Sequence, residues 1–188
     1  MHKTIILDLD STLNDMHLQV YKLFRDNYGY NLSDFSIPKD FPFDITEIHN
    51  LIEKHNLLNL TKPLTGAGDL LETIKTLGFE VGIITSRKCY KNTPESVTLD
   101  WLKKYKLEPD WIEITDTEKY LIFQTRKLEC FLFLDDDPKQ LTAAFNAKVA
   151  EYYATLIYPW TKHLPHDVLQ FNDLFAVSDF IKHAKKIG

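Results

Sequence analysis

Short apolar runs alternate with longer amphipathic stretches along most of this chain. The apolar runs lie at residues 4–7, 79–84, 111–114 and 131–134, with a weaker fifth run at 155–158. They are rich in Ile, Val and Phe and are bounded by turn signals, which is typical of buried strands. The stretches between them have the length of helices, and neighbouring parallel strands need such crossovers. The pattern predicts an α/β fold with a parallel sheet covered by helices on both faces.

The crossover helices are expected at 69–77, at 94–107 and from Pro138 onwards, with a terminal helix at 178–187. Their apolar residues recur with helical spacing, so that one side of each helix can pack on the sheet. The third crossover contains no glycine before residue 153, and its end is therefore not marked by the sequence.

The interval 14–65 departs from this alternation. It has no strong strand and instead predicts helices near 15–28 and 44–57. We interpret it as a small helical cap inserted after the first strand of a core formed by residues 1–13 and 66–188. Ligands of open parallel sheets bind beyond the carboxyl ends of the strands. A cap inserted there is expected to cover the site and exclude water.

Aromatic and histidine residues provide candidates for ligand contact. Phe41 and Phe43 are flanked by prolines within the cap and are the best candidates for a surface that stacks on a ligand. Trp160 is a further candidate at the edge of the site, although it can also serve as an aromatic plug. His49 and His55 do not share a helix face and are expected to lie on the surface.

Acidic residues follow two of the predicted strands. Asp8 and Asp10 come after the first run, and Asp135 and Asp136 after the run at 131–134. Residues two apart share one face of a strand, about 7 Å apart at the Cα atoms. Asp and Ser also end strands at turns, but carboxylates held this close repel unless a cation lies between them. Two such strand ends together predict a divalent metal site.

The strand at 79–84 ends in two hydroxyl residues, Thr85 and Ser86, followed by Arg87 and Lys88. Hydroxyls and free backbone N–H groups at a strand end can donate several hydrogen bonds to phosphate oxygens. Because the two cations add positive charge at the same edge, the segment is a candidate anion site.

Composition excludes several other classes. The 188 residues carry a formal charge of −5, which does not favour a polynucleotide ligand. No apolar stretch approaches the roughly 20 residues that span a bilayer. Cys89 and Cys130 lack metal or redox spacing and are expected to be reduced thiols, so a cytoplasmic location is expected. A monomer or homodimer is expected.

Four short segments, taken in order along the chain, resemble the four motifs of the haloacid dehalogenase (HAD) superfamily of phosphatases. They are residues 8–12, residues 85–86, a lysine that follows these, and residues 135–136. The resemblance covers nearly the whole chain. The position of the cap and the segments 134–138 and 158–160 are similar to those of cytosolic type 5'(3')-deoxyribonucleotidases. This resemblance implies a Rossmann-like core and a Mg²⁺-dependent phosphomonoesterase. Its implied substrate is a small molecule, a nucleoside or deoxynucleoside 5'-monophosphate.

The resemblance also implies roles for the acids. Asp8 would be the nucleophile that becomes an aspartyl phosphate. Asp10 would be the general acid and then the general base. Mg²⁺ prefers oxygen ligands, and these would come from Asp8, from Asp136 and from the backbone carbonyl of Asp10, with Asp135 beside them.

By the same resemblance, Thr85 and Ser86 would bind the phosphoryl group together with a lysine. Lys119, near the start of a helix, is favoured for this role over Lys127, which lies at the expected end of that helix. Asp137 departs from the nucleotidases, which commonly carry a basic residue there, and this bears on the substrate more than on the reaction.

Two other functions stay open at this point. A HAD phosphatase of a sugar phosphate or another small metabolite would have polar residues lining its cap. A non-catalytic, phosphate-sensing receiver-like domain also uses an acidic pair, a hydroxyl and a lysine, although receivers carry the phosphorylated Asp in mid-chain and have no cap.

Overall fold

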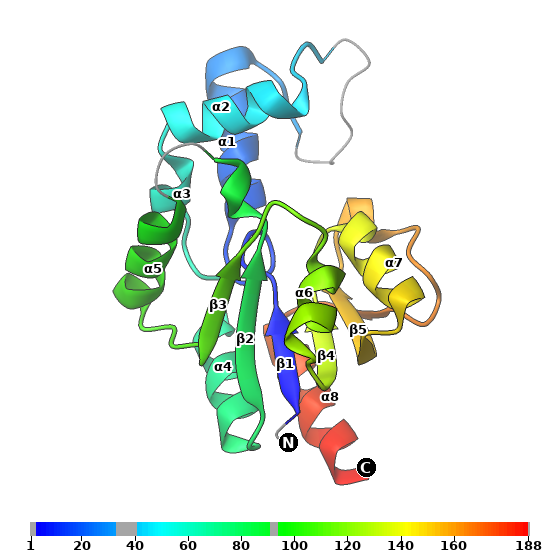
Figure 1. The fold of residues 1–188 in the computed structure, drawn as a ribbon. Helices are drawn as coiled ribbons and strands as arrows, with labels where there is room; N and C mark the ends of the chain where they lie inside the picture. Colours follow the sequence, from blue (N-terminus) through cyan, green and yellow to red (C-terminus); the bar gives the residue numbers. More distant parts are fainter. Residues whose placement is uncertain (1–2, 33–40, 91–93, 188) are drawn as a thin grey trace.

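A six-stranded parallel sheet forms the centre of the computed structural model, which describes residues 3–32, 41–90 and 94–187 (Figure 1). Its order is β3-β2-β1-β4-β5-β6, and each neighbouring pair is parallel. The strands are β1 (Thr4–Leu7), β2 (Glu80–Thr85), β3 (Trp111–Ile114), β4 (Cys130–Leu134), β5 (Ala150–Leu156) and β6 (Leu169–Phe171). The predicted parallel α/β fold is therefore confirmed.

Alternate residues of the central strand face opposite layers of helices. Ile5 and Leu7 belong to the hydrophobic core on one face of the sheet, and Ile6 belongs to the core on the other. The first layer contains α4 (Ala67–Thr76), α5 (Pro94–Tyr105) and α8 (Leu174–Ile187), and the second contains α6 (Lys119–Arg126) and α7 (Pro138–Ala147). Within the described ranges, none of the helices has the length and apolar character needed to cross a membrane.

The helices between β1 and α4 lie beyond the carboxyl ends of the strands (Figure 1). They are α1 (Met16–Tyr28), α2 (Ile45–Lys54) and α3 (Leu57–Leu60), and they share a small apolar core of their own. Asn14 forms a bridge with Pro63 where the chain leaves the sheet and returns to it. The helices therefore lie above the strand ends that carry the acidic residues.

Two predicted elements end or begin elsewhere because a residue other than glycine adopts a left-handed backbone. Asn56, with φ 54°, separates α2 from α3 within the single helix expected at 44–57. Lys148, with φ 51°, ends α7, so that β5 begins at Ala150 and not at residue 155. Strand β6 was not predicted, because its three residues are too few to give a periodic signal.

Candidate active site

A lysine and two aspartates form a buried ionic cluster at the carboxyl ends of the central strands. Asp8 follows β1, Asp135 follows β4, and Lys119 is the first residue of α6. The Lys119 Nζ atom lies 2.5 Å from Asp8 Oδ1 and 2.7 Å from Asp135 Oδ2. The exposed fractions of Asp8, Lys119 and Asp135 are 4%, 3% and 1%. The structure thus brings together acids that are 127 residues apart in sequence (135 minus 8) around one ammonium group.

The cluster holds more negative charge than Lys119 can neutralise. One carboxylate oxygen from each of Asp8, Asp135 and Asp136 lies within 4.8 Å of the others. Burial, reinforced by the neighbouring carboxylates, raises the pKa of Asp8 to about 7 and raises the pKa of Asp136 well above its usual range. Burial opposes the charged form of Lys119, but Asp135 and Asp8 outweigh it and raise the Lys119 pKa. An oxygen-only donor set with excess negative charge fits a hard divalent cation such as Mg²⁺.

The predicted hydroxyl pair faces the same cavity as the acids. Thr85 is the last residue of β2, and Ser86 follows it. Both line a cavity of about 440 Å³ together with Asp8 and Asp10. A phosphate in this cavity can therefore meet a carboxylate from one strand and hydroxyl donors from the next.

Asp10 accepts hydrogen bonds from two side chains. Arg87 donates from Nε to Oδ2 at 2.8 Å and from Nη2 to Oδ1 at 2.6 Å, and Asn14 donates to Oδ1 at 2.9 Å. Burial disfavours the charged form of Asp10, but Arg87 and Asn14 outweigh it and lower the Asp10 pKa. Arg87 was expected to add positive charge to an anion site, whereas its guanidinium is bound to Asp10.

Phe41 and Phe43, predicted to stack on a ligand, are not among the residues that line this cavity. Their rings lie 5.3 Å apart, and each lies 5.1 Å from the ring of Phe24, with Tyr28 and Tyr30 close by. Aromatic rings in this edge-to-face arrangement stabilise one another by burial and by their quadrupoles. Their apolar character therefore reflects packing within the helical segment.

Trp160, expected at the edge of the site, contacts the backbone of one of its acidic residues. Its Nε1 atom donates to the carbonyl oxygen of Asp136 at 2.9 Å, and its ring stacks on Tyr158 with centroids 4.4 Å apart. The Tyr158 hydroxyl donates to the carbonyl of Ser11 at 2.7 Å. Both rings thus hold the loops that present the acidic residues.

Several residues that line the cavity were not anticipated from the sequence, among them His49, Tyr90 and Gln140. His49 from α2 and Tyr90 line the cavity with ring centroids 5.2 Å apart, although His49 was expected at the surface. Gln140 accepts a hydrogen bond from the Lys119 backbone N–H at 2.9 Å. Gln140 lies in the first turn of α7, directly after the acidic segment, and this position in the sequence could have indicated that it lies near the site. The position of His49 depends on how α2 approaches the sheet, which leaves no signal in one sequence.

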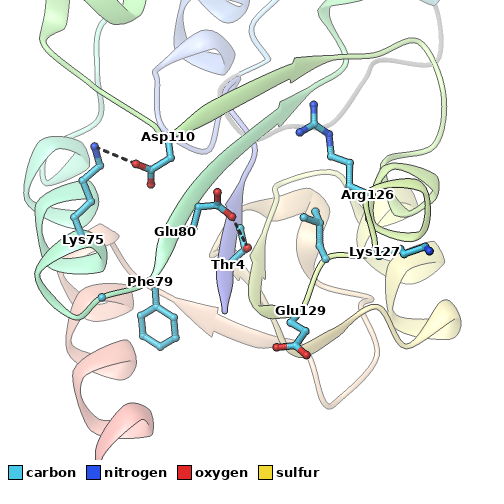
Figure 2. Close-up of a pocket in the computed structure, with 10 residues that line it drawn as sticks. Thr4, Lys75, Phe79, Glu80, Asp110, Arg126, Lys127 and Glu129 are labelled. Carbon is cyan, nitrogen blue, oxygen red and sulfur yellow. Dashed lines mark hydrogen bonds and ion pairs between the residues drawn. The ribbon is translucent and has the colours of Figure 1, made fainter. Parts of the chain in front are cut away.

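Lys127 belongs to a different cavity. It ends α6 and lines a hollow of about 680 Å³ with residues at the amino ends of β1, β2 and β4 (Figure 2). The other labelled residues around it are Thr4, Lys75, Phe79, Glu80, Asp110, Arg126 and Glu129. Of the two candidate lysines, the structure therefore brings Lys119 to the acids and places Lys127 at the opposite end of the sheet.

Comparison with solved structures finds similar folds along almost the whole chain. A HAD-superfamily hydrolase from Ehrlichia chaffeensis shares 18% identity over 97% of this chain and 98% of that one, with a TM-score of 0.56. A protein described as a predicted phosphatase from Clostridium acetobutylicum shares 17% over 97% and 99%, with a TM-score of 0.68. A HAD family hydrolase from Deinococcus radiodurans, solved with bound phosphate and sodium, shares 12% over 98% and 95%, with a TM-score of 0.59.

At the level of sequence, neither the protein-family models nor the curated proteins give a match. At identities this low, a structural likeness establishes the fold and leaves the reaction to be argued from the site. The solved structures named above include HAD-superfamily hydrolases, and the fold of this chain is HAD-like.

Proposed function

We propose that this protein is a Mg²⁺-dependent phosphomonoesterase that hydrolyses nucleoside or deoxynucleoside 5'-monophosphates through phosphorylation of Asp8. The observation that carries the proposal is the buried Asp8 carboxylate, which contacts Lys119 and faces the Thr85 and Ser86 hydroxyls across one cavity. The likeness of the fold to HAD hydrolases and phosphatases supports the same class of reaction.

The reaction divides into two displacements at phosphorus. In the first, an oxygen of Asp8 attacks phosphorus, the bond to the leaving alcohol breaks, and that alcohol takes a proton from Asp10. In the second, water attacks the phosphorus of the aspartyl phosphate and gives a proton to Asp10, while the bond to Asp8 breaks and phosphate is released. Lys119, between Asp8 and Asp135, offsets negative charge throughout.

The metal would be held by Asp8, Asp135 and Asp136 together with the backbone carbonyl of Asp10. When bound, Mg²⁺ would lower the repulsion between an anionic nucleophile and an anionic phosphate and stabilise charge on the transferring group.

Two features of the cavity bear on the substrate. The rings of His49 and Tyr90 offer faces on which a nucleobase can stack, which supports a nucleotide. The polar side chains of Thr117, Glu118 and Gln140 line the same cavity and favour the alternative substrate, a sugar phosphate.

The test is a panel of nucleoside monophosphates, deoxynucleoside monophosphates and sugar phosphates, each assayed for phosphate release with and without Mg²⁺. We expect release only with Mg²⁺, with the highest kcat/KM for a nucleotide, and none from Asp8→Asn. A higher kcat/KM for a sugar phosphate would reassign the substrate. A lasting phosphoprotein after acetyl phosphate treatment, with no steady phosphate release, would replace the enzyme with a receiver-like domain.

A further inference from the structure

Arg87 is a buried cation that the proposed chemistry has not yet used. Its exposed fraction is 1%, and it is among the largest fully buried side chains of the protein. Two of its nitrogens form parallel hydrogen bonds to Asp10, and Nη1 donates to Thr98 Oγ1 on α5 at 3.0 Å. A forked guanidinium–carboxylate pair fixes the plane of the carboxylate as well as its position.

The location of Arg87 does not suit a phosphate ligand. Asp10 lines the cavity, whereas Arg87 does not, so the carboxylate separates the guanidinium from any bound substrate. An arginine that binds phosphate must present N–H groups to the ligand, and here they point to Asp10 and Thr98. The cation nearest to the Asp8 carboxylate is instead Lys119.

Asn14 also holds the Asp10 carboxylate in place. Asn14 donates to Asp10 Oδ1, and its own amide oxygen accepts from the backbone N–H groups of Ser11 and Met16. Within the part of the chain that the structure describes, Asp10 Oδ1 accepts two hydrogen bonds and Oδ2 accepts one. A carboxylate oxygen offers two lone pairs, so Oδ2 keeps one that can exchange a proton, and Asp10 lines the cavity.

We propose that Arg87 is a positioning residue that orients Asp10 for proton transfer and does not bind the phosphate. The inference rests on the proposed phosphatase function. Asp10 gives a proton to the leaving alcohol in the first displacement and takes one from water in the second. Loss of its orientation slows the second step for every substrate, but slows the first only where the leaving group needs that proton.

The test compares Arg87→Met and Arg87→Lys with the wild type, with Arg126→Met as the matched control because Arg126 lies at the other end of the sheet. The substrates are p-nitrophenyl phosphate, whose leaving group departs without a proton, and a nucleoside monophosphate. We expect Arg87→Met to lower kcat for the nucleotide by about 10² to 10⁴-fold, the usual contribution of general acid–base catalysis. Inhibition by inorganic phosphate should stay within about twofold, since no phosphate contact is lost.

Stopped-flow measurement on p-nitrophenyl phosphate gives a readout that a merely structural role would not move. Arg87→Met should release one equivalent of p-nitrophenol per enzyme in a burst and then turn over slowly, because only hydrolysis of the phosphorylated Asp8 is impaired. Arg87→Lys should lose less, since it keeps the charge without the fork. Arg126→Met should behave as the wild type.

Three results would overturn the inference. One is a tenfold rise in the phosphate inhibition constant with kcat retained, which would make Arg87 a phosphate ligand. Another is unchanged kinetics in Arg87→Met, and the third is an equal loss for both substrates without a burst. If Arg87→Met does not fold by circular dichroism, Arg87→Lys carries the same test. A wild type with no phosphatase activity would overturn the proposed function as well, whereas an active wild type beside an unaffected variant overturns the role of Arg87 alone.

Discussion

Both ends of the sheet carry hollows lined with charged residues, but the charges are buried at the carboxyl end and exposed at the amino end. At the carboxyl end, Asp8 and Asp135 are buried and share Lys119. At the amino end, charges form exposed pairs, such as Lys75 with Asp110 at 3.8 Å, whose side chains are 40% and 42% exposed (Figure 2). The amino-end hollow is the larger, at about 680 Å³ against about 440 Å³.

Size therefore does not distinguish the site, but buried and unbalanced charge does. Three carboxylates around one ammonium group lose much of their hydration on folding, and their mutual repulsion is offset only when a further cation or a proton is bound. Exposed pairs keep their water and cost little. The unfavourable electrostatics at the carboxyl end thus mark the place where a ligand completes the structure, which the amino end does not require.

The largest expected effect is the loss of turnover in Asp8→Asn. An amide cannot attack phosphorus, so kcat should fall on the order of 10⁴-fold or more, as it does when other hydrolases lose their nucleophile. The fold should persist, because burial already disfavours the charged form of Asp8, whose pKa is raised to about 7, and asparagine removes that charge. Phosphate release and far-UV circular dichroism measure the two outcomes. Undiminished activity would show that Asp8 is not the nucleophile.

Replacement of Lys119 by Met should give the largest loss of stability. The change leaves Asp8 and Asp135 buried without their shared cation, and breaking a buried pair in this way costs about 3–5 kcal/mol. Urea unfolding without metal measures the difference. Lys127→Met, at the amino-end hollow, is the matched control and should change the free energy of unfolding by less than about 0.5 kcal/mol. Equal losses in both variants would remove the contrast between the two ends.

Added Mg²⁺ should stabilise the carboxyl end selectively. At a concentration about 100 times its dissociation constant, a ligand adds about 2.7 kcal/mol, which raises Tm by about 5–10 °C in a chain of this size. Asp136→Asn should abolish the rise, because Asp136 is one of the three clustered carboxylates. Glu129→Gln at the amino-end hollow should keep it. Thermal scans with and without Mg²⁺ are the measurement, and a rise that survives Asp136→Asn would place the ion elsewhere.

The carboxyl end was the more predictable part of the molecule, because strand ends leave a strong local pattern. Apolar runs followed by acids marked the ends of β1 and β4, and parallel topology brings such ends to one edge. The boundary of β5 was missed since Lys148, and not a glycine, ends the preceding helix. The spacing of apolar residues does not indicate where a lysine adopts a left-handed backbone and ends a helix.

Residues that reach the site from other elements were less predictable. Arg87 binds Asp10 from 77 positions away, and nothing in its neighbourhood distinguishes it from an anion ligand. The same holds for His49, whose contact with Tyr90 exists only after α2 has docked. The stacking role predicted for Phe41 and Phe43 stays a prediction, because an aromatic pair beside prolines suits a ligand surface or the ring packing seen here equally well.

A smaller effect is expected where the cavity meets α2. Tyr90→Ala removes one ring of the pair with His49 and should raise KM for a nucleotide about tenfold, in line with the usual contribution of stacking to base binding. KM for a small phosphomonoester without a ring should not change. Phe43→Leu is the matched control, because the Phe43 ring packs against Phe24 of α1, and it should alter neither KM. Unchanged nucleotide affinity in Tyr90→Ala would favour the sugar phosphate as substrate.

The smallest effect belongs to the amino end, where Lys75→Met removes an exposed partner of Asp110. The Nζ–Oδ1 distance of 3.8 Å and the exposure of both side chains predict a loss below about 1 kcal/mol, reduced further by salt. The kinetics should not change, since Lys75 is separated from the acids by the length of the strands. Urea unfolding at low and high salt, beside kcat and KM, measures both. A fall in kcat would mean that the larger hollow at the amino end takes part in the reaction. Buried and unbalanced charge would then not be enough to identify which end of the sheet is the active site.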